Sequence, residues 1–362
     1  MVDDAQRSVA QFIAELAELR RLSGQPSLRR MEVLSRKAKR PRLPHSTAGD
    51  ALTGRRLPPI AVVLGIVHAC LDSAREDGVE VDLSLFNPIK WQDRWLKVSR
   101  LCDEQDEQPA HQPLLDHITP PAPAGMMWLP DRRRSGYLII GNVLSQEAPP
   151  LPGVARNIHD LTASLETAAP WMKATTILDP TMEKATLALQ AAARQAEDVL
   201  IIHLLGHGYL DDRVNLRLLT SDSRFNDLSR TALDLTGMIA NLRVNSNAQA
   251  LVLIVDTCFA GSVIPKSGRN SKQHLFVLAA TDAHGLAIDG PNSLTGVMAS
   301  ILGQGVPDCL FPMLSVEHLA RECARTLEQR QRDYPRLPHQ VVTTFSQGDA
   351  RKVTFGLNAV AQ

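Results

Sequence analysis

The sequence predicts a small all-α domain followed by a larger α/β domain, in which a mostly parallel sheet is flanked by helices. Two observations carry this prediction. Near the N-terminus, apolar residues recur at helical spacing, as in Phe12, Leu16, Leu19 and Leu22. From Gly136 onward, short runs of leucine and β-branched residues alternate with helical patterns. This alternation is typical of parallel strands buried under helices on both faces.

Residues 103–133 separate the two predicted domains. They are rich in proline and polar residues and have no hydrophobic period, so we expect a partly extended linker. Trp128, near its end, is expected to dock on a folded surface. The predicted boundaries are therefore 1–102 for the helical domain, 103–133 for the linker and 134–362 for the α/β domain.

Proline and glycine divide the helical domain into four predicted helices. The first carries the apolar repeat, and the second follows Pro26-Ser27. The third begins around Pro44-His45-Ser46-Thr47, where the serine and threonine are expected to cap it, and continues through Ala51-Leu52. The fourth covers residues 59–71.

The α/β domain is predicted to contain five core strands and the helices between them. The strands are expected at residues 136–142, 174–179, 198–206, 250–256 and 274–282, and the helices at 161–168, 182–195, 233–243, 295–302 and 315–330.

The composition is that of a soluble globular protein. Of 362 residues, 44% are hydrophobic and 22% charged, and the net charge of zero indicates no particular partner. The N-terminal stretch lacks the pattern of a secretory signal, and the apolar runs are too short for a membrane span. Five widely spaced cysteines without a CxxC motif argue against disulfides and zinc and favour a cytoplasmic location.

Two of the predicted strands end at chemically reactive residues. The run VLIIHLLGHGYLDD stops at His207-Gly208, and the next core strand, ALVLIVDTCFAGS, stops at Asp256-Thr257-Cys258. The carboxyl ends of parallel strands share one edge of a sheet, where functional groups gather. Because sequential strands are often neighbours, we expect His207 and Cys258 to meet there.

A thiol beside an imidazole is suited to nucleophilic catalysis. The imidazole takes the thiol proton and later protonates a leaving amine. Gly208 and Gly261 follow the two residues and allow backbone amides to face a developing oxyanion. A lone histidine or cysteine at a strand end is more often structural, as we expect for His203, but the two glycine-rich turns together favour catalysis.

The two turns resemble those of the caspase-like cysteine peptidases, most of all the bacterial caspase and metacaspase branch. The resemblance lies in GHG after one apolar strand and DTCFAGS after the next, about fifty residues later. The segments YLIIGNVL, PPLPGVARNIHDL and NSLTGVMASIL agree with it, although Leu294 stands where phenylalanine is common. The similarity covers roughly residues 135–357.

The resemblance implies peptide-bond hydrolysis by a Cys258–His207 dyad, without a cofactor and with a protein as substrate. It implies that the backbone N–H groups of Gly208 and Cys258 form the oxyanion hole. It also places Asp256 at the floor of the pocket for the residue before the scissile bond, where a carboxylate favours Arg or Lys. An alternative for Asp256 is a strand-end carboxylate that caps nearby amides.

The sequence departs from the metacaspase pattern around this pocket. Asn157 stands where a second pocket acid is frequent, Leu205 where a small residue or serine is frequent, and Phe259 where a histidine is frequent. With one pocket acid instead of two, the preference for basic residues is expected to be weaker, and a hydrophobic or small residue is an alternative.

For the other polar segments, the sequence supports a functional role less strongly. Asp211 and Asp212 could orient His207, but a solvated turn is the favoured interpretation. A calcium site is conceivable at Asp222, Asp227 and Asp234, but their spacing does not match an EF-hand loop. The basic segment 264–274, with Lys266, Arg269 and Lys272, resembles an exposed loop that caspase relatives cut or reorder during activation.

The helical domain carries a cluster of basic residues. The cluster comprises Arg29, Arg30, Arg36, Lys37, Lys39, Arg40, Arg42, Arg55 and Arg56, against only Glu32 and Asp50. Short helices with such a stretch resemble the helix-turn-helix modules of many actinobacterial regulators, in which basic residues neutralise DNA phosphates. A charged face that binds signalling or target proteins is the slightly favoured alternative.

Two functions are therefore in competition. The first is a cysteine endopeptidase with a regulatory, cell-death or defence role, fused to a regulatory or recruiting module. The second is a DNA-binding regulator or scaffold with a catalytically idle caspase-like domain. The presence of both His207 and Cys258 favours the first.

Overall fold

The chain forms two compact units. The computed structural model describes residues 2–38, 43–103, 127–146, 148–211, 213–265, 273–307, 309, 311–334 and 340–361. One unit consists of Met1–Gln108 with Tyr209–Asn215, and the other of Pro109–Gly208 with Leu216–Gln362. In the described ranges, no helix combines the length and apolarity needed to span a bilayer.

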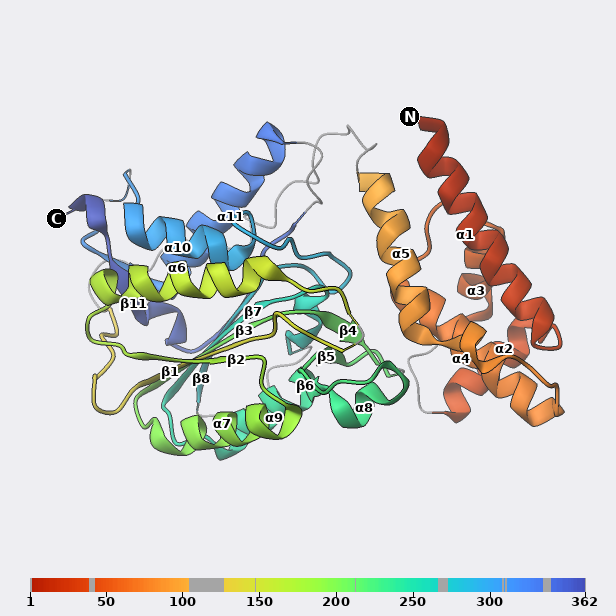
Figure 1. The fold of residues 1–362 in the computed structure, drawn as a ribbon, viewed down its shortest axis with the longest axis horizontal. Coiled ribbons are helices and arrows are strands. Elements are labelled where there is room, and N and C mark those ends of the chain that lie inside the picture. Colours follow the sequence, from red (N-terminus) through yellow and green to blue (C-terminus); the bar gives the residue numbers. More distant parts are fainter. Residues whose placement is uncertain are drawn as a thin grey trace. The chain divides into compact units, whose positions relative to one another are not determined.

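The first unit is helical. Its helices are α1 (Val2–Leu22), α2 (Leu28–Lys37), α3 (His45–Thr53), α4 (Ile60–Asp77) and α5 (Pro88–Asp103) (Figure 1). Its core contains the fully buried Phe12 and Leu16 of α1, and the ring of Phe12 packs edge-on against Trp91 of α5 at a centroid distance of 5.5 Å. The sequence pattern predicts the first four helices but does not single out α5.

The start of α3 corrects one prediction. Ser46 and Thr47 lie inside the first turn of this helix, and the N-cap is Pro44, which makes no side-chain capping bond. Proline sets an extended backbone before the helix without any cap hydrogen bond, so a serine or threonine close to a helix start was a misleading signal. By contrast, Ser27 caps α2 as a hydrogen-bond acceptor from Arg30 N.

The second unit is built on a six-stranded sheet with the strand order β10-β8-β7-β3-β1-β2. All neighbouring strands are parallel except the edge pair β10 and β8. The strands are β1 (Gly136–Gly141), β2 (Ala174–Leu178), β3 (Val199–Leu205), β7 (Ala250–Asp256), β8 (His274–Ala279) and β10 (Thr343–Gln347). The five predicted core strands are confirmed, whereas β10 was not predicted.

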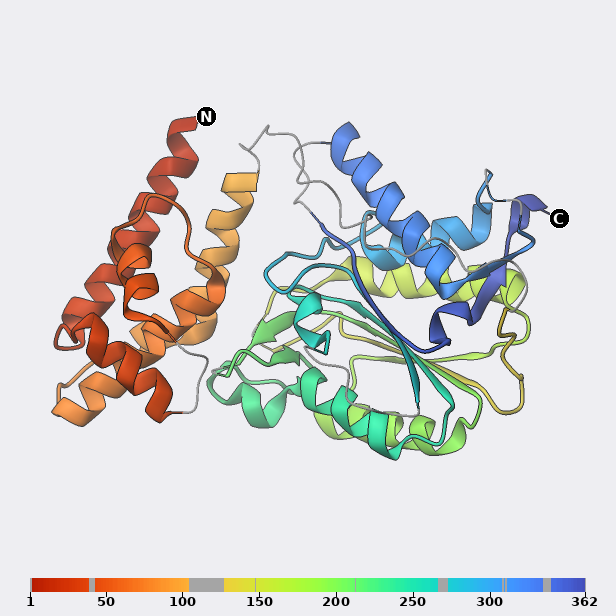
Figure 2. The same ribbon diagram turned by 180° about the vertical axis from the view of Figure 1, so that it is seen from behind.

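Helices cover both faces of this sheet, which confirms the predicted α/β class. One group of helices covers one face and a second group covers the other (Figures 1 and 2). The first group is α6 (Pro152–Ala168), α10 (Leu294–Gln304) and α11 (Val316–Asp333), and the second is α7 (Met182–Gln195) and α9 (Leu235–Asn245). The central strands β3 and β7 are buried along their whole length, as expected for parallel strands covered on both faces.

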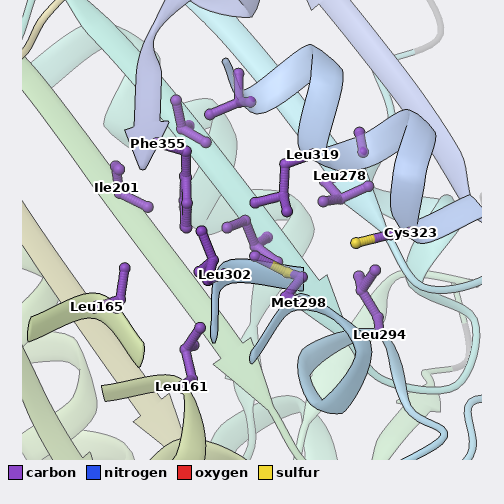
Figure 3. Packing of buried hydrophobic residues seen from close by; sticks show 14 of the residues in the cluster. Leu161, Leu165, Ile201, Leu278, Leu294, Met298, Leu302, Leu319, Cys323 and Phe355 are labelled. Carbon is purple, nitrogen blue, oxygen red and sulfur yellow. The ribbon is translucent and has the colours of Figure 1, made fainter. Parts of the chain in front are cut away.

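One hydrophobic cluster fixes α10 and α11 on the sheet. Figure 3 shows Met298 and Leu302 of α10 together with Leu319 and Cys323 of α11 and Phe355. All five side chains are almost completely buried. Each large apolar side chain removed from water in this way stabilises the fold by about 1.5–3 kcal/mol. This packing holds the start of α10 close to the carboxyl end of the sheet.

Shorter elements complete the second unit. They are β5 (Leu216–Leu218), β6 (Leu233–Asp234), α8 (Leu228–Thr231), β9 (Met313–Ser315) and β11 (Thr354–Leu357), with β4 (Gly208–Leu210) at the unit boundary. None of them was predicted, because strands and helices of two to four residues carry too little periodicity. Trp128 docks as expected: its indole Nε1 donates to Asp198 at 2.9 Å, and its backbone bridges to Val353.

Candidate active site

The register of β3 and β7 brings the two reactive turns together. The strands are parallel neighbours, and Leu205, the last residue of β3, lies opposite Asp256, the last residue of β7. The backbone N–H of Gly206 also donates to the carbonyl of Asp256 at 3.4 Å. The turns that carry His207 and Cys258 therefore leave the sheet side by side from its carboxyl edge.

Glycines allow these turns to make direct contact. A Cβ atom on Gly208 would overlap the carbonyl oxygen of Cys258 and crowd the side chain of Thr257. Gly206 has a φ of +142°, a conformation that side-chain-bearing residues rarely adopt. The glycines on both sides of His207 are therefore required for the close approach of its turn to the cysteine turn.

The cysteine turn is clamped from the other side by residues 281–285. Phe259 N donates to the carbonyl of Gly285 and Ala260 N to Oγ1 of Thr281, both at 2.9 Å. Phe259 has a left-handed backbone with φ +62° and a fully buried ring. Its burial anchors the turn, while the preceding Cys258 stays half-buried.

The ring of His207 is oriented by a backbone carbonyl. Its Nε2 lies 2.7 Å from the carbonyl oxygen of Pro149. A carbonyl oxygen only accepts hydrogen bonds, so Nε2 carries the proton and, in the neutral ring, Nδ1 is the basic nitrogen. No third member beside the dyad is evident from the sequence, because residue type does not mark a backbone carbonyl group.

Asp256 is tied to the start of α10. Its Oδ2 accepts hydrogen bonds from Thr295 N at 2.8 Å and Thr295 Oγ1 at 2.7 Å. The side chain is 7% exposed. Burial raises the pKa of the Asp256 carboxyl, while the hydrogen bonds from Thr295 act in the opposite direction. The carboxylate therefore binds one backbone amide and one hydroxyl at the helix start, close to the interpretation of a strand-end carboxylate that caps nearby amides, and it lies beside the turn that carries Cys258.

The other two predicted pocket residues have different surroundings. Asn157 is buried on α6, where its Nδ2 donates to the carbonyl of Gly290 and to Ser293 Oγ, both at 2.9 Å. It therefore holds the same helix start as Asp256. Leu205 is 1% exposed and belongs to the hydrophobic cluster under the sheet.

Asn142 was missed by the sequence analysis. It follows β1 at the same sheet edge, and both of its buried side-chain amide atoms lack a hydrogen-bond partner within the described residues. Its Cβ would lie 3.1 Å from a Cβ on Gly206. An asparagine directly after the first strand was the available sequence signal.

The remaining polar candidates have structural roles. Asp211 organises its turn by accepting from the backbone N–H groups of Arg213 and Asn215, both at 2.9 Å, whereas Asp212 lies outside the described residues. Asp222 accepts from Met182 N at the start of α7, and Asp234 caps α9. Within the described part of the chain, no group of acidic, histidine or cysteine side chains is arranged to hold a metal ion.

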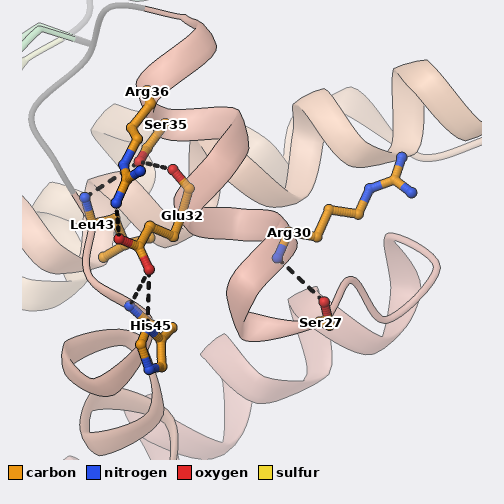
Figure 4. A network of polar contacts seen from close by, with 7 residues as sticks. All are labelled: Ser27, Arg30, Glu32, Ser35, Arg36, Leu43 and His45. Atoms are coloured by element: carbon orange, nitrogen blue, oxygen red, sulfur yellow. Dashed lines mark hydrogen bonds and ion pairs between the residues drawn. The ribbon is translucent and has the colours of Figure 1, made fainter.

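Several basic residues of the helical unit are paired with acidic ones. Arg30 binds Asp77 at 2.7 Å, and Lys37 pairs with Glu76. Arg36 pairs with Glu32 (Figure 4). Arg29, Arg55 and Arg56 are exposed. Lys39, Arg40 and Arg42 lie outside the described residues, as do Lys266, Arg269 and Lys272 of the predicted activation loop.

Comparisons with known proteins find similarity to solved structures. No family model matches the chain, and no curated protein matches it. Among solved structures, the chain is similar to the crystal structure of caspase-1 from Spodoptera frugiperda. The two are 14% identical over 59% of this chain and 88% of that chain, with a TM-score of 0.40. Similarity at this level assigns no activity.

Proposed function

We propose that the protein is a cysteine endopeptidase in which Cys258 is the nucleophile and His207 the general base and acid. The observation that supports this most is the register of Leu205 opposite Asp256, because it brings the histidine turn against the cysteine turn. The resemblance of both turns to those of caspase-like peptidases is independent support from the sequence.

The reaction begins with proton transfer from Cys258 Sγ to the basic Nδ1 of His207. The thiolate attacks the carbonyl carbon of the scissile peptide bond, and the N–H groups of Gly208 and Cys258 stabilise the oxyanion that forms. The C–N bond then breaks, and His207 gives its proton to the leaving amine. Water, deprotonated by the same imidazole, hydrolyses the thioester and releases the acid product.

The carbonyl of Pro149 supports this cycle because it holds Nε2–H of His207 and stabilises the imidazolium that forms after the first step. No cofactor takes part. The Asp256 carboxylate favours a substrate with a basic residue before the scissile bond, since a buried charge is stabilised by an opposite one.

The helical unit acts as a regulatory or recruiting module for signalling or target proteins, an assignment that the internal ion pairs of its basic face support.

The decisive experiment compares cleavage of a fluorogenic peptide library by the wild type, Cys258→Ala and His207→Ala. Loss of all cleavage in both variants supports the proposal. Persistent cleavage by Cys258→Ala would show that the activity comes from another site or a contaminant.

Thiol labelling separates the peptidase from an idle scaffold. Cys258 and Cys309 are both half-buried, so a peptidase should react with iodoacetamide faster at Cys258 than at Cys309. In His207→Ala, the labelling rate at Cys258 should fall to that at Cys309, and the rate at Cys309 should not change. Burial raises the pKa of Cys70 to about 11, so this thiol is expected to label slowly and serves as an internal reference. Equal rates at Cys258 and Cys309 in the wild type would favour the scaffold.

A further inference from the structure

A chain of buried hydrogen bonds runs from the core to Asp256, at the carboxyl edge of the sheet. Tyr137 on β1 places its hydroxyl 3.1 Å from Nδ1 of His203 on β3. His203 Nε2 lies 2.9 Å from Thr295 Oγ1 at the start of α10, and that hydroxyl reaches Asp256 Oδ2 at 2.7 Å. The side chains of Tyr137, His203 and Thr295 are at most 3% exposed. We call these four residues the relay.

The donor and the acceptor of every hydrogen bond in the relay follow from the bond between Thr295 and Asp256. Thr295 Oγ1 has one proton and donates it to Asp256, so it accepts from His203, and Nε2 carries the proton. Burial lowers the pKa of His203 to about 3, which keeps the ring neutral. Nδ1 is therefore an acceptor, and it takes the proton of the Tyr137 hydroxyl. The tautomer of His203 is thus fixed by Asp256.

The relay uses only one of the two Asp256 oxygens. Oδ2 already accepts from both the N–H and the hydroxyl of Thr295. Oδ1 is buried and makes no direct hydrogen bond among the described residues, and the hydroxyl of Ser293 acts to lower the pKa of the carboxyl. A buried carboxylate oxygen without a partner is costly, so Oδ1 is the atom that a bound group would satisfy.

Asn157, which holds the same helix start, also has one unused hydrogen-bond acceptor, its side-chain carbonyl oxygen. Among the described residues, both hydrogen bonds of its side chain use Nδ2, toward Gly290 O and Ser293 Oγ. Because Gly290 O is an acceptor only, the orientation of the amide is fixed, and its carbonyl oxygen is left for another donor. The start of α10 therefore offers one open acceptor oxygen on Asp256 and one on Asn157, rather than a carboxylate with both oxygens open.

The two basic side chains need different acceptors. A guanidinium binds carboxylate best through two parallel hydrogen bonds, one to each oxygen. An ammonium is a compact charge with three donors that reach separate oxygens. We propose that the pocket selects lysine over arginine before the scissile bond, and that Tyr137, His203 and Thr295 are positioning residues that enforce this choice. The inference rests on the proposed peptidase function.

The first test uses two peptides that differ only in lysine or arginine before the scissile bond. The wild type should cleave the lysine peptide with a kcat/KM at least about tenfold higher. Thr295→Val removes the hydroxyl from Oδ2 and should shift the ratio toward arginine, whereas Thr295→Ser retains the hydroxyl and should restore the wild-type ratio. Thr354→Val is the matched control, since the Thr354 hydroxyl is buried without a partner in the described structure and should leave the ratio unchanged.

The inference is overturned if the wild type cleaves the arginine peptide as well as the lysine peptide. It is equally overturned if Thr295→Val keeps the wild-type ratio, or if Thr295→Ser shifts it as far as Thr295→Val does. In each of these cases, cleavage itself would still support the proposed peptidase function. The lysine preference and the peptidase function can therefore be rejected independently.

A second measurement does not depend on catalysis. In Cys258→Ala, nitrogen NMR of His203 should show the Nε2–H tautomer, and titration with n-butylamine should perturb the pocket at lower concentration than n-butylguanidinium does. The Nδ1–H tautomer, or equal responses to the two cations, would overturn the inference. If the wild type cleaves no peptide at all, the peptidase proposal falls, while this titration still decides whether the pocket selects an ammonium.

Discussion

The imidazole Nε2 of His207 lies 2.7 Å from the carbonyl oxygen of Pro149. This single contact fixes which nitrogen of the ring is basic. It also joins the loop after β1 to the turn after β3, two segments 58 positions apart in the chain. The orientation of the candidate base therefore depends on a loop that carries no reactive side chain of its own at this contact.

Replacing Pro149 by glycine should impair this orientation. Glycine leaves the carbonyl in place but gives the backbone more freedom, so the ring of His207 is held less firmly. We expect kcat to fall by about tenfold with little change in KM, measured on a fluorogenic peptide.

Pro180→Gly is the matched control for this change. Its carbonyl also accepts a loop hydrogen bond, from Ser221 N at 3.0 Å, without contacting His207. An equal loss of kcat in both variants would argue that the effect is general loosening of the fold.

Replacing Gly208 by alanine should separate the two turns. The new Cβ would overlap the carbonyl oxygen of Cys258, and displacing reacting groups by about 1 Å costs on the order of a hundredfold in rate. We expect kcat/KM to fall by about that factor while circular dichroism shows an intact fold.

Gly78→Ala provides the comparison for Gly208→Ala. Gly78 has a φ of +65° and open space around its missing side chain, so this variant should lose some stability and retain full activity. Wild-type activity of Gly208→Ala would contradict the close contact of the turns.

His203 should make the stability of the protein depend on pH. Its pKa is lowered by burial to about 3, below the value of about 6.5 in an unfolded chain. Between these pH values the unfolded chain binds more protons, so the free energy of unfolding decreases as the pH falls. Asp256 acts with the opposite sign, because its raised pKa removes stability as the pH rises through it.

The variant His203→Gln isolates the first contribution. Glutamine offers a donor and an acceptor but does not titrate. We expect its free energy of unfolding, measured by urea titration, to fall less than that of the wild type between about pH 6.5 and about pH 4. The difference is bounded by about 1.4 kcal/mol per pH unit. Parallel pH profiles for the two proteins would show that His203 is not neutral and buried in the native state.

Glu32 should be important for the stability of the helical unit. It is 8% exposed. It accepts hydrogen bonds from Arg36 on its own helix α2 and from the backbone N–H of His45 at the start of α3. Its carboxylate oxygen Oε2 also lies 2.9 Å from His45 Nδ1. Figure 4 shows these contacts. Glu32→Ala leaves those donors without their partner and should destabilise the protein by about 1–3 kcal/mol in urea titrations.

Glu18→Ala is the control, since the pair that Glu18 forms with Arg21 is exposed. Such pairs contribute little to stability, so the midpoint should hardly change. A similar loss in the two variants would indicate that Glu32 does not act through its buried contacts.

Much of the fold was predictable because its signals are local. Runs such as those of β3 and β7 are continuously apolar since both faces of each strand are buried, and this pattern is visible in the sequence itself. The edge strand β10 gave no such signal, because its residues Thr343–Gln347 are mostly polar and none of them is buried. The start of α3 was wrong for a similar reason: a proline before the helix replaced the side-chain cap that the residue types suggested.

The sequence by itself determined the α/β class, the central strands, and the position of His207 and Cys258 directly after two of those strands. Only the tertiary structure decided that β3 and β7 are neighbours in a register that joins the two turns, that the Pro149 carbonyl orients the imidazole, and that Asp256 has one oxygen bound to Thr295. The physical reason is that periodicity records which residues are buried, whereas hydrogen bonds between backbone groups and distant side chains depend on how the elements pack.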